Sequence, residues 1–296
     1  MSWIELHIHT NADYADSLSD QLTLLGALAV TFQDAGDQPV YEPTPGDVHL
    51  WQDTIVIGLF DHTLQPEPIL TWLENQQAAG LVNSFQLKNL ADQDWERICL
   101  EHFKPIQFGK RLWVCPSWQS PPNTDAVNLI LDPGLAFGTG THPTTALCLQ
   151  WLDENINKTP LVIDYGCGSG ILGLAALKLG AKQVIAVDND PQALEATLKN
   201  SQRNQDVANQ LTVHLPDDID ESALSADIFI ANILAQPLIM LAPRFANMTH
   251  SGSQILLSGI LAEQAEQVID AYTPWFVFKK PIVQQNEWIR LEGTRI

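Results

Sequence analysis

Basic residues are scarce in this sequence. Its 296 residues include 15 lysines and arginines against 35 aspartates and glutamates, which gives a formal net charge of −20. General nucleic-acid binders depend on Lys and Arg to neutralise phosphates, so this composition argues against such a protein. The same charge favours a basic partner through electrostatic attraction, although it would also serve solubility alone.

Cysteines are also few, and long apolar runs are missing. The four cysteines have no C-x-x-C spacing, which argues against a zinc site and suggests free thiols in a reducing compartment. No apolar run approaches the roughly 18 residues of a membrane helix, and no basic leader with a signal-length apolar stretch begins the chain. We therefore expect a soluble, cytoplasmic protein without a metal site.

The most informative stretch begins with the apolar, β-branched run 161–164, which predicts a buried strand. Residues 171–179 predict a helix, and residues 184–187 predict a second buried strand that ends at Asp188. Such a strand–glycine loop–helix–strand unit forms a parallel sheet, and its glycines let the backbone approach a ligand closely. Because an acid at the end of the second strand can accept ribose hydroxyls, this unit predicts a site for a ligand with an adenosine-like end.

Two ligand templates compete for the glycine loop. Residues 168–173 satisfy G-x-G-x-x-G, with Asp188 about 20 residues further on, as in dinucleotide-binding proteins. Residues 164–170 satisfy D-x-G-x-G-x-G, which resembles the first motif of class I S-adenosylmethionine-dependent methyltransferases. The acid Asp164 would repel a pyrophosphate but suits the ammonium and sulfonium of S-adenosylmethionine. We favour the methyl donor, and a nicotinamide-dependent oxidoreductase stays the alternative.

A second loop, residues 132–145, is rich in glycine and hydroxyl groups and leads into a helix predicted from Thr145 to Asp153. A threonine near a helix start can simply cap the helix, but one cap does not require so many glycines and threonines. We therefore expect this loop to fold over a ligand.

A further polar residue follows a buried strand predicted for residues 226–232. Asn232 ends this strand, and parallel sheets bind ligands in the crevice at the carboxyl ends of their strands. The alternative is an Asx turn leading into a helix at Pro237. Asp217 and Asp218 follow another strand and could face an adenine, although a solvated acidic loop is the more economical interpretation.

Residues 1–90 predict a smaller domain, and residues 91–104 a linker with a short helix from Asp92 to His102. His7 and His9 share one face of the first strand, where a solvated face is favoured over a metal site. The order β-α-β, β-α-β suggests a small ferredoxin-like α+β domain. The expected strands are 3–9, 30–34, 54–60 and 85–90, and the expected helices are 16–29 and 66–77.

Three stretches together resemble the ribosomal protein L11 methyltransferase family: residues 164–170, 136–145 and 232–238. The resemblance is close over residues 90–296 and looser before them. It implies an α/β, Rossmann-like class I methyltransferase fold with a mostly parallel sheet over residues 105–296. It also implies that residues 1–90 form a substrate-recognition domain.

The resemblance further implies an activity. Members transfer methyl groups from S-adenosylmethionine to lysine side-chain and N-terminal amines of the large-subunit ribosomal protein L11. Asn232 is our candidate catalytic residue, because it would position the amine or the methionine end of the donor. We expect a monomer with no direct nucleic-acid specificity. The family's cofactor contacts, with Gly168 added from the glycine loop, fall on Thr145, Gly166, Gly168, Asp188 and Asn232.

Other functions stay open at this point. A class I methyltransferase could act on another protein or on nucleic acid, but Ile-Leu-Ala follows Asn232 where many of those enzymes have Pro-Pro-aromatic. The chain could also be a non-catalytic adaptor that only grips a ribosomal protein. Labelled methyl donor offered with purified ribosomal proteins would separate these alternatives.

Overall fold

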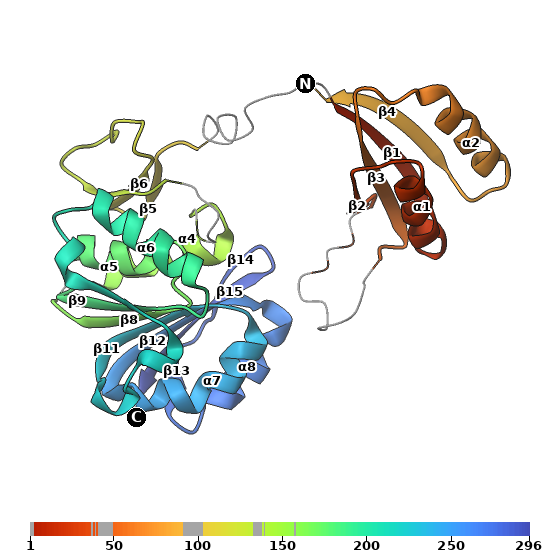
Figure 1. Cartoon of the computed structure of the whole chain (residues 1–296). Coiled ribbons are helices and arrows are strands. Elements are labelled where there is room, and N and C mark those ends of the chain that lie inside the picture. Colours follow the sequence, from red (N-terminus) through yellow and green to blue (C-terminus); the bar gives the residue numbers. More distant parts are fainter. Residues whose placement is uncertain are drawn as a thin grey trace. The chain divides into compact units, whose positions relative to one another are not determined.

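The computed structural model describes residues 3–36, 38, 40, 50–90, 103–132, 138, 140–156 and 158–296. Its internal contacts divide the chain into two compact units, residues 1–98 and 99–296, which are considered separately (Figure 1). The linker helix predicted for residues 92–102 lies outside the described residues. No helix in the described part of the chain is long and apolar enough to cross a membrane.

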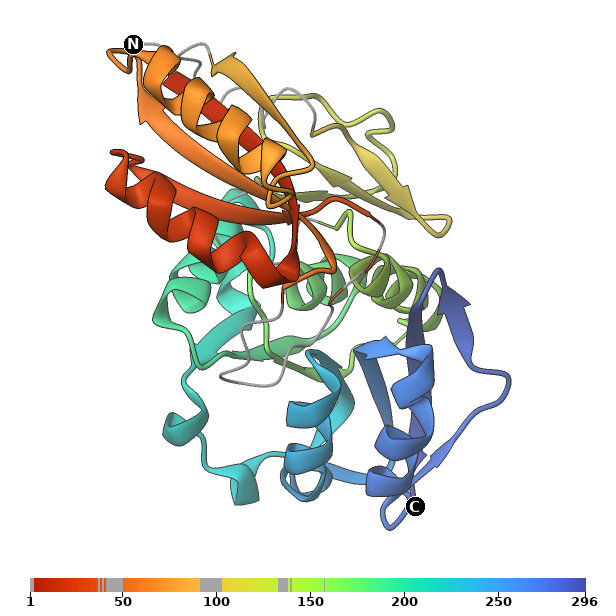
Figure 2. The same cartoon turned by 90° about the vertical axis from the view of Figure 1, so that its right-hand side faces the viewer.

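The first unit is an antiparallel sheet with strand order β2-β3-β1-β4, and Figure 2 shows its two helices on the same face. Alternate residues of β1, among them Leu6 and Ile8, are buried in the core that these helices cover. The predicted β-α-β-β-α-β order is present, while the ferredoxin-like classification stays a prediction. The elements are β1 (Trp3–Asn11), α1 (Ala12–Leu24), β2 (Ala29–Asp34), β3 (Asp53–Asp61), α2 (Pro66–Ala78) and β4 (Ser84–Leu90).

The prediction for α1 was wrong at both ends. The helix begins at Ala12 and ends at Leu24, whereas the leucine spacing predicts 16–29. Gly26 has a left-handed backbone with φ of 97°, which ends the helix in a way that apolar spacing alone does not reveal.

The second unit has a large sheet with strand order β10-β9-β8-β11-β12-β15-β13, and β14 pairs with β15. The strands β10, β9, β8, β11 and β12 all run parallel to one another, and β15 runs antiparallel to β12. A separate three-stranded sheet has the order β5-β6-β7. The strands are β5 (Ile106–Phe108), β6 (Leu112–Cys115), β7 (Val127–Ile130), β8 (Leu161–Tyr165), β9 (Gln183–Val187), β10 (Leu211–His214), β11 (Ala226–Asn232), β12 (Thr249–Leu261), β13 (Phe276–Phe278), β14 (Val283–Gln285) and β15 (Trp288–Arg295).

Helices cover both faces of the large sheet, as Figure 1 shows. The side chains of β8 alternate between the two cores, so that Val162 packs toward α4 and α5 while Ile163 packs toward α7 and α8. This two-faced burial explains why the central strands are almost uninterrupted apolar runs. The helices are α4 (Pro143–Asn155), α5 (Ile171–Leu179), α6 (Pro191–Arg203), α7 (Ala235–Asn247) and α8 (Ala265–Tyr272).

The strand order places a topological switch point between β8 and β11. From β8 the chain continues through β9 to β10 on one side, and β11 and β12 lie on the other. Open parallel sheets bind ligands at such a point, outside the carboxyl ends of the strands.

Strand β12 is longer than the sequence predicts. It runs from Thr249 to Leu261, whereas the sequence predicts a strand over residues 254–258 with Gly259 after it. Gly252 and Gly259, with φ of 90° and 82°, lie where the pairing of β12 with its neighbours is irregular. These bulge glycines let the strand continue, although they look like strand ends in the sequence.

Candidate functional site

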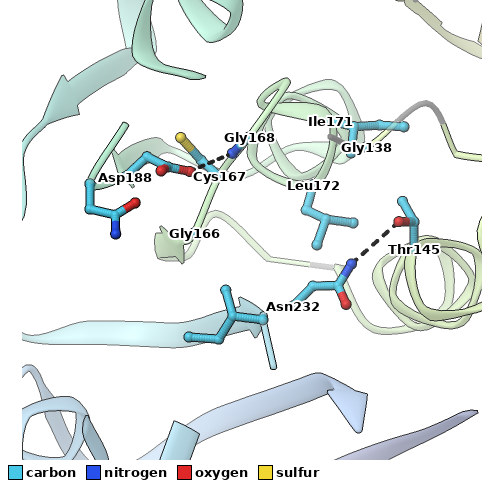
Figure 3. A pocket seen from close by; sticks show the side chains of 11 residues that line it. Gly138, Thr145, Gly166, Cys167, Gly168, Ile171, Leu172, Asp188 and Asn232 are labelled. Atoms are coloured by element: carbon cyan, nitrogen blue, oxygen red, sulfur yellow. Dashed lines mark hydrogen bonds between the residues drawn. The ribbon is translucent and has the colours of Figure 1, made fainter. Parts of the chain in front are cut away.

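A cavity of about 210 Å³ opens at this switch point, at the carboxyl ends of β8, β9 and β11 (Figure 3). The five residues proposed from the sequence to bind a cofactor all line it, so the structure brings them together. The described lining comprises Gly138, Thr145, Gly166, Cys167, Gly168, Ile171, Leu172, Asp188, Asn189, Asn232 and Ile233. Residues 133–137 and 139 of the second loop lie outside the described residues.

The glycine loop joins β8 to α5 along one side of the cavity. Gly166, Gly168 and Gly170 have left-handed φ angles of 78°, 54° and 79°, which L side chains rarely adopt. A Cβ on Gly166 would also collide with the side chain of Ile233. The turn therefore requires glycine for its left-handed backbone, and Gly166 also because it lies so close to Ile233.

Side chains from α6 hold the loop from behind. The Thr197 hydroxyl donates to the Gly168 carbonyl at 3.0 Å, and the Asn200 amide donates to the Ser169 carbonyl at 2.9 Å. The Ser169 hydroxyl donates in turn to the Gly138 carbonyl at 2.6 Å, which ties the second loop to the first. All three side chains are buried, so these bonds fix the loop in a dry environment.

Sequence reasoning missed this support. Thr197 and Asn200 lie three residues apart in α6, and each is at least 96% buried although polar. Their spacing was a usable signal, because buried amides and hydroxyls at one face of a helix must find partners.

Asp188 occupies the end of β9 as predicted. Its Oδ2 accepts a hydrogen bond from the Gly168 N–H at 2.9 Å, and its Oδ1 accepts from the Asp190 N–H at 3.0 Å. Each carboxylate oxygen keeps a further lone pair that can accept from a ligand. Two backbone bonds thus aim the carboxylate toward the cavity, where it can receive a pair of hydroxyls.

Thr145 and Asn232 form the opposite side. His142 caps α4, because its Nδ1 accepts from the Thr144 N–H at 3.3 Å, so the predicted helix start at Thr145 was wrong. Thr145 is therefore available to the cavity, and its Oγ1 accepts a hydrogen bond from Asn232 Nδ2 at 3.3 Å (Figure 3). The buried Asn232 Oδ1 has no partner among the described residues.

This unpartnered oxygen restricts what the site can bind. A buried acceptor without a donor costs about 1–3 kcal/mol, so natural sites rarely keep one without a use. Asn232 Oδ1 needs an N–H or O–H donor from outside the described protein. An ammonium or amine supplies such a donor, whereas a phosphate or carboxylate does not.

Asp164 lies one layer below the cavity and does not line it. The side chain is fully buried, and its Oδ2 accepts from the Gly173 N–H of α5 at 2.8 Å. The pKa of Asp164 is raised to about 7, mainly by burial and also by the nearby Asp188 carboxylate, against the lowering effect of the Gly173 bond. Asp164 therefore fixes the first turns of α5 and does not itself contact a ligand in the cavity.

The remaining candidates stand apart from the cavity. Asp217 and Asp218 are exposed in a short 3-10 helix and do not line it. His7 Nε2 lies 3.0 Å from Glu5 Oε2 on the first unit. Within the described ranges, no group of three His, Cys, Asp or Glu side chains is arranged to hold a metal ion.

These features define a class of protein. The parallel sheet with its switch point, the glycine loop and the acid on the next strand make up the class I methyltransferase fold. The chain belongs to the ribosomal protein L11 methyltransferase family, whose model, described as "Ribosomal protein L11 methyltransferase (PrmA)", matches residues 2–296.

Two relatives match this chain over its full length, and a solved structure matches part of it. The chain is 50% identical over 296 residues to a ribosomal protein L11 methyltransferase of Nitrosococcus oceani, covering 100% of both chains. It is 52% identical over 298 residues to the protein of that name from Marinobacter nauticus, covering 100% of this chain and 99% of the other. A crystal structure of ribosomal protein L11 methylase from Lactobacillus delbrueckii subsp. bulgaricus matches with a TM-score of 0.57 and 31% identity, over 65% of this chain and 99% of that one.

Proposed function

We propose that this chain transfers methyl groups from S-adenosylmethionine to lysine side-chain and N-terminal amines of ribosomal protein L11. The observation that carries the proposal is the cavity itself. It combines a glycine loop, a carboxylate that lines the cavity and a buried amide oxygen without a hydrogen-bond donor among the described residues, in a chain of this family.

The described residues fit the methyl donor. Asp188 would accept the ribose hydroxyls, and Gly166 and Gly168 would lie against the methionine part. Asn232 Oδ1 would accept from the donor's ammonium or from the incoming amine, and Thr145 would hold the Asn232 amide in place. When bound, S-adenosylmethionine supplies an electrophilic methyl group on its sulfonium, so the protein mainly has to align the partners and exclude water.

The incoming amine must be neutral to react, although a free lysine has a pKa of about 10.4. Ile171, Leu172 and Ile233 give the cavity an apolar wall that would lower the pKa of an amine bound there. Asp188 and Cys167 are the titratable groups of the described lining. Asp188 is engaged with backbone N–H groups, and burial raises the pKa of the Cys167 thiol, so neither serves as a general base. With no general base among the described lining residues, we expect the proton to leave to solvent before the attack.

We assign substrate recognition to the first unit, within residues 1–90. These residues contain twelve aspartates and glutamates but a single lysine, Lys88, which suits a basic protein substrate. The same charge opposes direct recognition of nucleic acid. We further propose that the protein acts as a monomer in the cytoplasm.

Radiolabelled S-adenosylmethionine incubated with the protein and purified L11 tests the function. We expect label on L11 and little on L11 whose amines have been chemically blocked beforehand, and peptide mass spectrometry should place it on lysines and the N-terminus. Ribosomal RNA offered in parallel serves as the competing substrate. Label on the RNA, or on no macromolecule, would refute the proposal.

A further inference from the structure

Gly259 lies in β12, directly beside the turn that follows Asn232. It is buried, its φ of 82° is left-handed, and the pairing of β12 with β15 is irregular between Leu257 and Ile260. A Cβ on Gly259 would collide with the Ile233 carbonyl oxygen and would approach the Ile233 C and N atoms at 2.8 and 3.1 Å. These are backbone atoms, so no side-chain rotation would relieve the collision.

Ile233 is held from two directions. Its backbone lies against Gly259, and its side chain lies against Gly166 of the glycine loop, where a Cβ would also collide. Asn232 pairs with Ser258 across the parallel strands, so the bulge begins opposite the site residue itself. Asn232 therefore directly precedes the residue whose backbone lies against β12.

We propose that Gly259 is a positioning residue for methyl transfer. Because it has no side chain, the Ile233 backbone can lie against β12, and this contact directs the Asn232 amide toward Thr145 and the cavity. The inference rests on the proposed function and adds to it a residue that touches neither donor nor amine. A misplacement of about 1 Å at a reacting centre can cost about a hundredfold in rate, which sets the expected scale.

The same strand contains a matched control. Gly252 also has a left-handed φ, of 90°, and lies at the other irregularity of β12, but a Cβ there would meet nothing within 4 Å. Gly252→Ala therefore carries the backbone strain of a left-handed alanine without the collision. The difference between Gly259→Ala and Gly252→Ala isolates the contact with Ile233.

The test measures kcat and KM for L11 in both variants, with melting curves to confirm folding. In Gly259→Ala we expect kcat to fall about a hundredfold while KM for L11 stays within about threefold, because the substrate-recognition unit is untouched. In Gly252→Ala we expect both constants to stay within about threefold of the parent. Equal kcat in the two variants would overturn the proposal. So would a Gly259→Ala protein that fails to fold beside a folded Gly252→Ala protein, since Gly259 would then hold the sheet rather than the turn.

A second measurement separates positioning from a general loss of structure. If Gly259 acts through Asn232, adding Gly259→Ala to an Asn232→Ala protein should lower kcat by less than about threefold, whereas independent roles would multiply. A parent protein that is inactive on L11 would refute the proposed function instead. Calorimetric titration with S-adenosylmethionine then still tests the role of Gly259. A positioning role predicts that Gly259→Ala binds S-adenosylmethionine at least about tenfold more weakly than Gly252→Ala.

Discussion

The two sides of the cavity are built differently. On the glycine-loop side, the carbonyls of Gly168 and Ser169 and both Asp188 oxygens already have hydrogen-bond partners within the protein. On the opposite side, the Asn232 amide donates to Thr145 but its oxygen has no partner among the described residues. On the glycine-loop side, these polar groups are hydrogen-bonded before a ligand arrives. On the Asn232 side, the amide oxygen needs a ligand to supply its hydrogen-bond donor.

This difference separates two tasks. A loop whose polar groups are already paired keeps its shape without ligand, as a platform for the methyl donor should. A buried oxygen that lacks a donor costs about 1–3 kcal/mol, and a bound N–H group would recover that energy. We infer that the Asn232 side was kept incomplete for the group that takes part in methyl transfer.

Removing the Asn232 side chain should have the largest effect on catalysis. We expect Asn232→Ala to lower kcat more than about a hundredfold, because the acceptor for the reacting end is lost. Stability should not fall, since the variant also removes a buried oxygen without a partner. Steady-state kinetics with L11 and a melting curve check both statements. An active variant with kcat near that of the parent would show that Asn232 has no role in transfer.

Removing the carboxylate on the glycine-loop side should affect binding instead. We expect Asp188→Ala to weaken S-adenosylmethionine affinity about a hundredfold, because a charge-assisted bond pair to the ribose is lost. Asp190→Ala is the matched control, since Asp190 caps α6 through the Gln192 N–H at 2.8 Å. That control should cost about 1 kcal/mol of stability and change donor affinity less than about threefold. Unchanged affinity of Asp188→Ala in calorimetry would contradict the assignment.

Loosening the support behind the loop should have a smaller effect. Thr197→Val keeps the shape of the side chain but removes the donor to the Gly168 carbonyl. We expect the affinity of this variant for S-adenosylmethionine to fall about tenfold, whereas Thr197→Ser, which keeps the hydroxyl, should bind S-adenosylmethionine within about threefold of the parent. If valine and serine behaved alike, the hydroxyl would have no part in holding the loop.

Replacing Asp164 should change S-adenosylmethionine binding least, because its role is in the stability of the fold and the pH dependence of that stability. Burial raises its folded pKa to about 7 from the ordinary value of 3.8, so the folded state binds an extra proton between these pH values. The contribution of Asp164 to stability should therefore fall as pH rises from 4 to 7 and level off above that range. Asp164→Asn should remove this loss, so urea unfolding should show a larger gain for the variant at pH 8 than at pH 5. The same gain at both pH values would contradict the pKa shift.

The sequence predicts local parts of this molecule well and distant contacts poorly. The glycine loop, α5 and Asp188 follow one another along the chain, so their spacing alone predicts the unit, and α5 spans residues 171–179 as expected. Asn232 was predicted as well, because a buried strand ends there. Each of these features depends on neighbours in the sequence.

The parts that were missed depend on residues far apart in the chain. Thr197 supports a loop 29 residues earlier, and the backbone of Ile233, in the turn after β11, lies against Gly259 of β12. No pattern within one segment contains that information. The start of α4 was misplaced for a different, local reason, since His142 rather than a threonine supplies the cap.

The most direct test is a crystal structure of the protein with S-adenosylhomocysteine and a lysine-containing peptide from L11. We predict that an N–H group of one of these ligands donates to Asn232 Oδ1, while the carbonyls of Gly168 and Ser169 keep their partners on α6. A structure in which Asn232 Oδ1 still lacks a partner, or in which the glycine loop has rearranged to bind the ligand, would contradict the account.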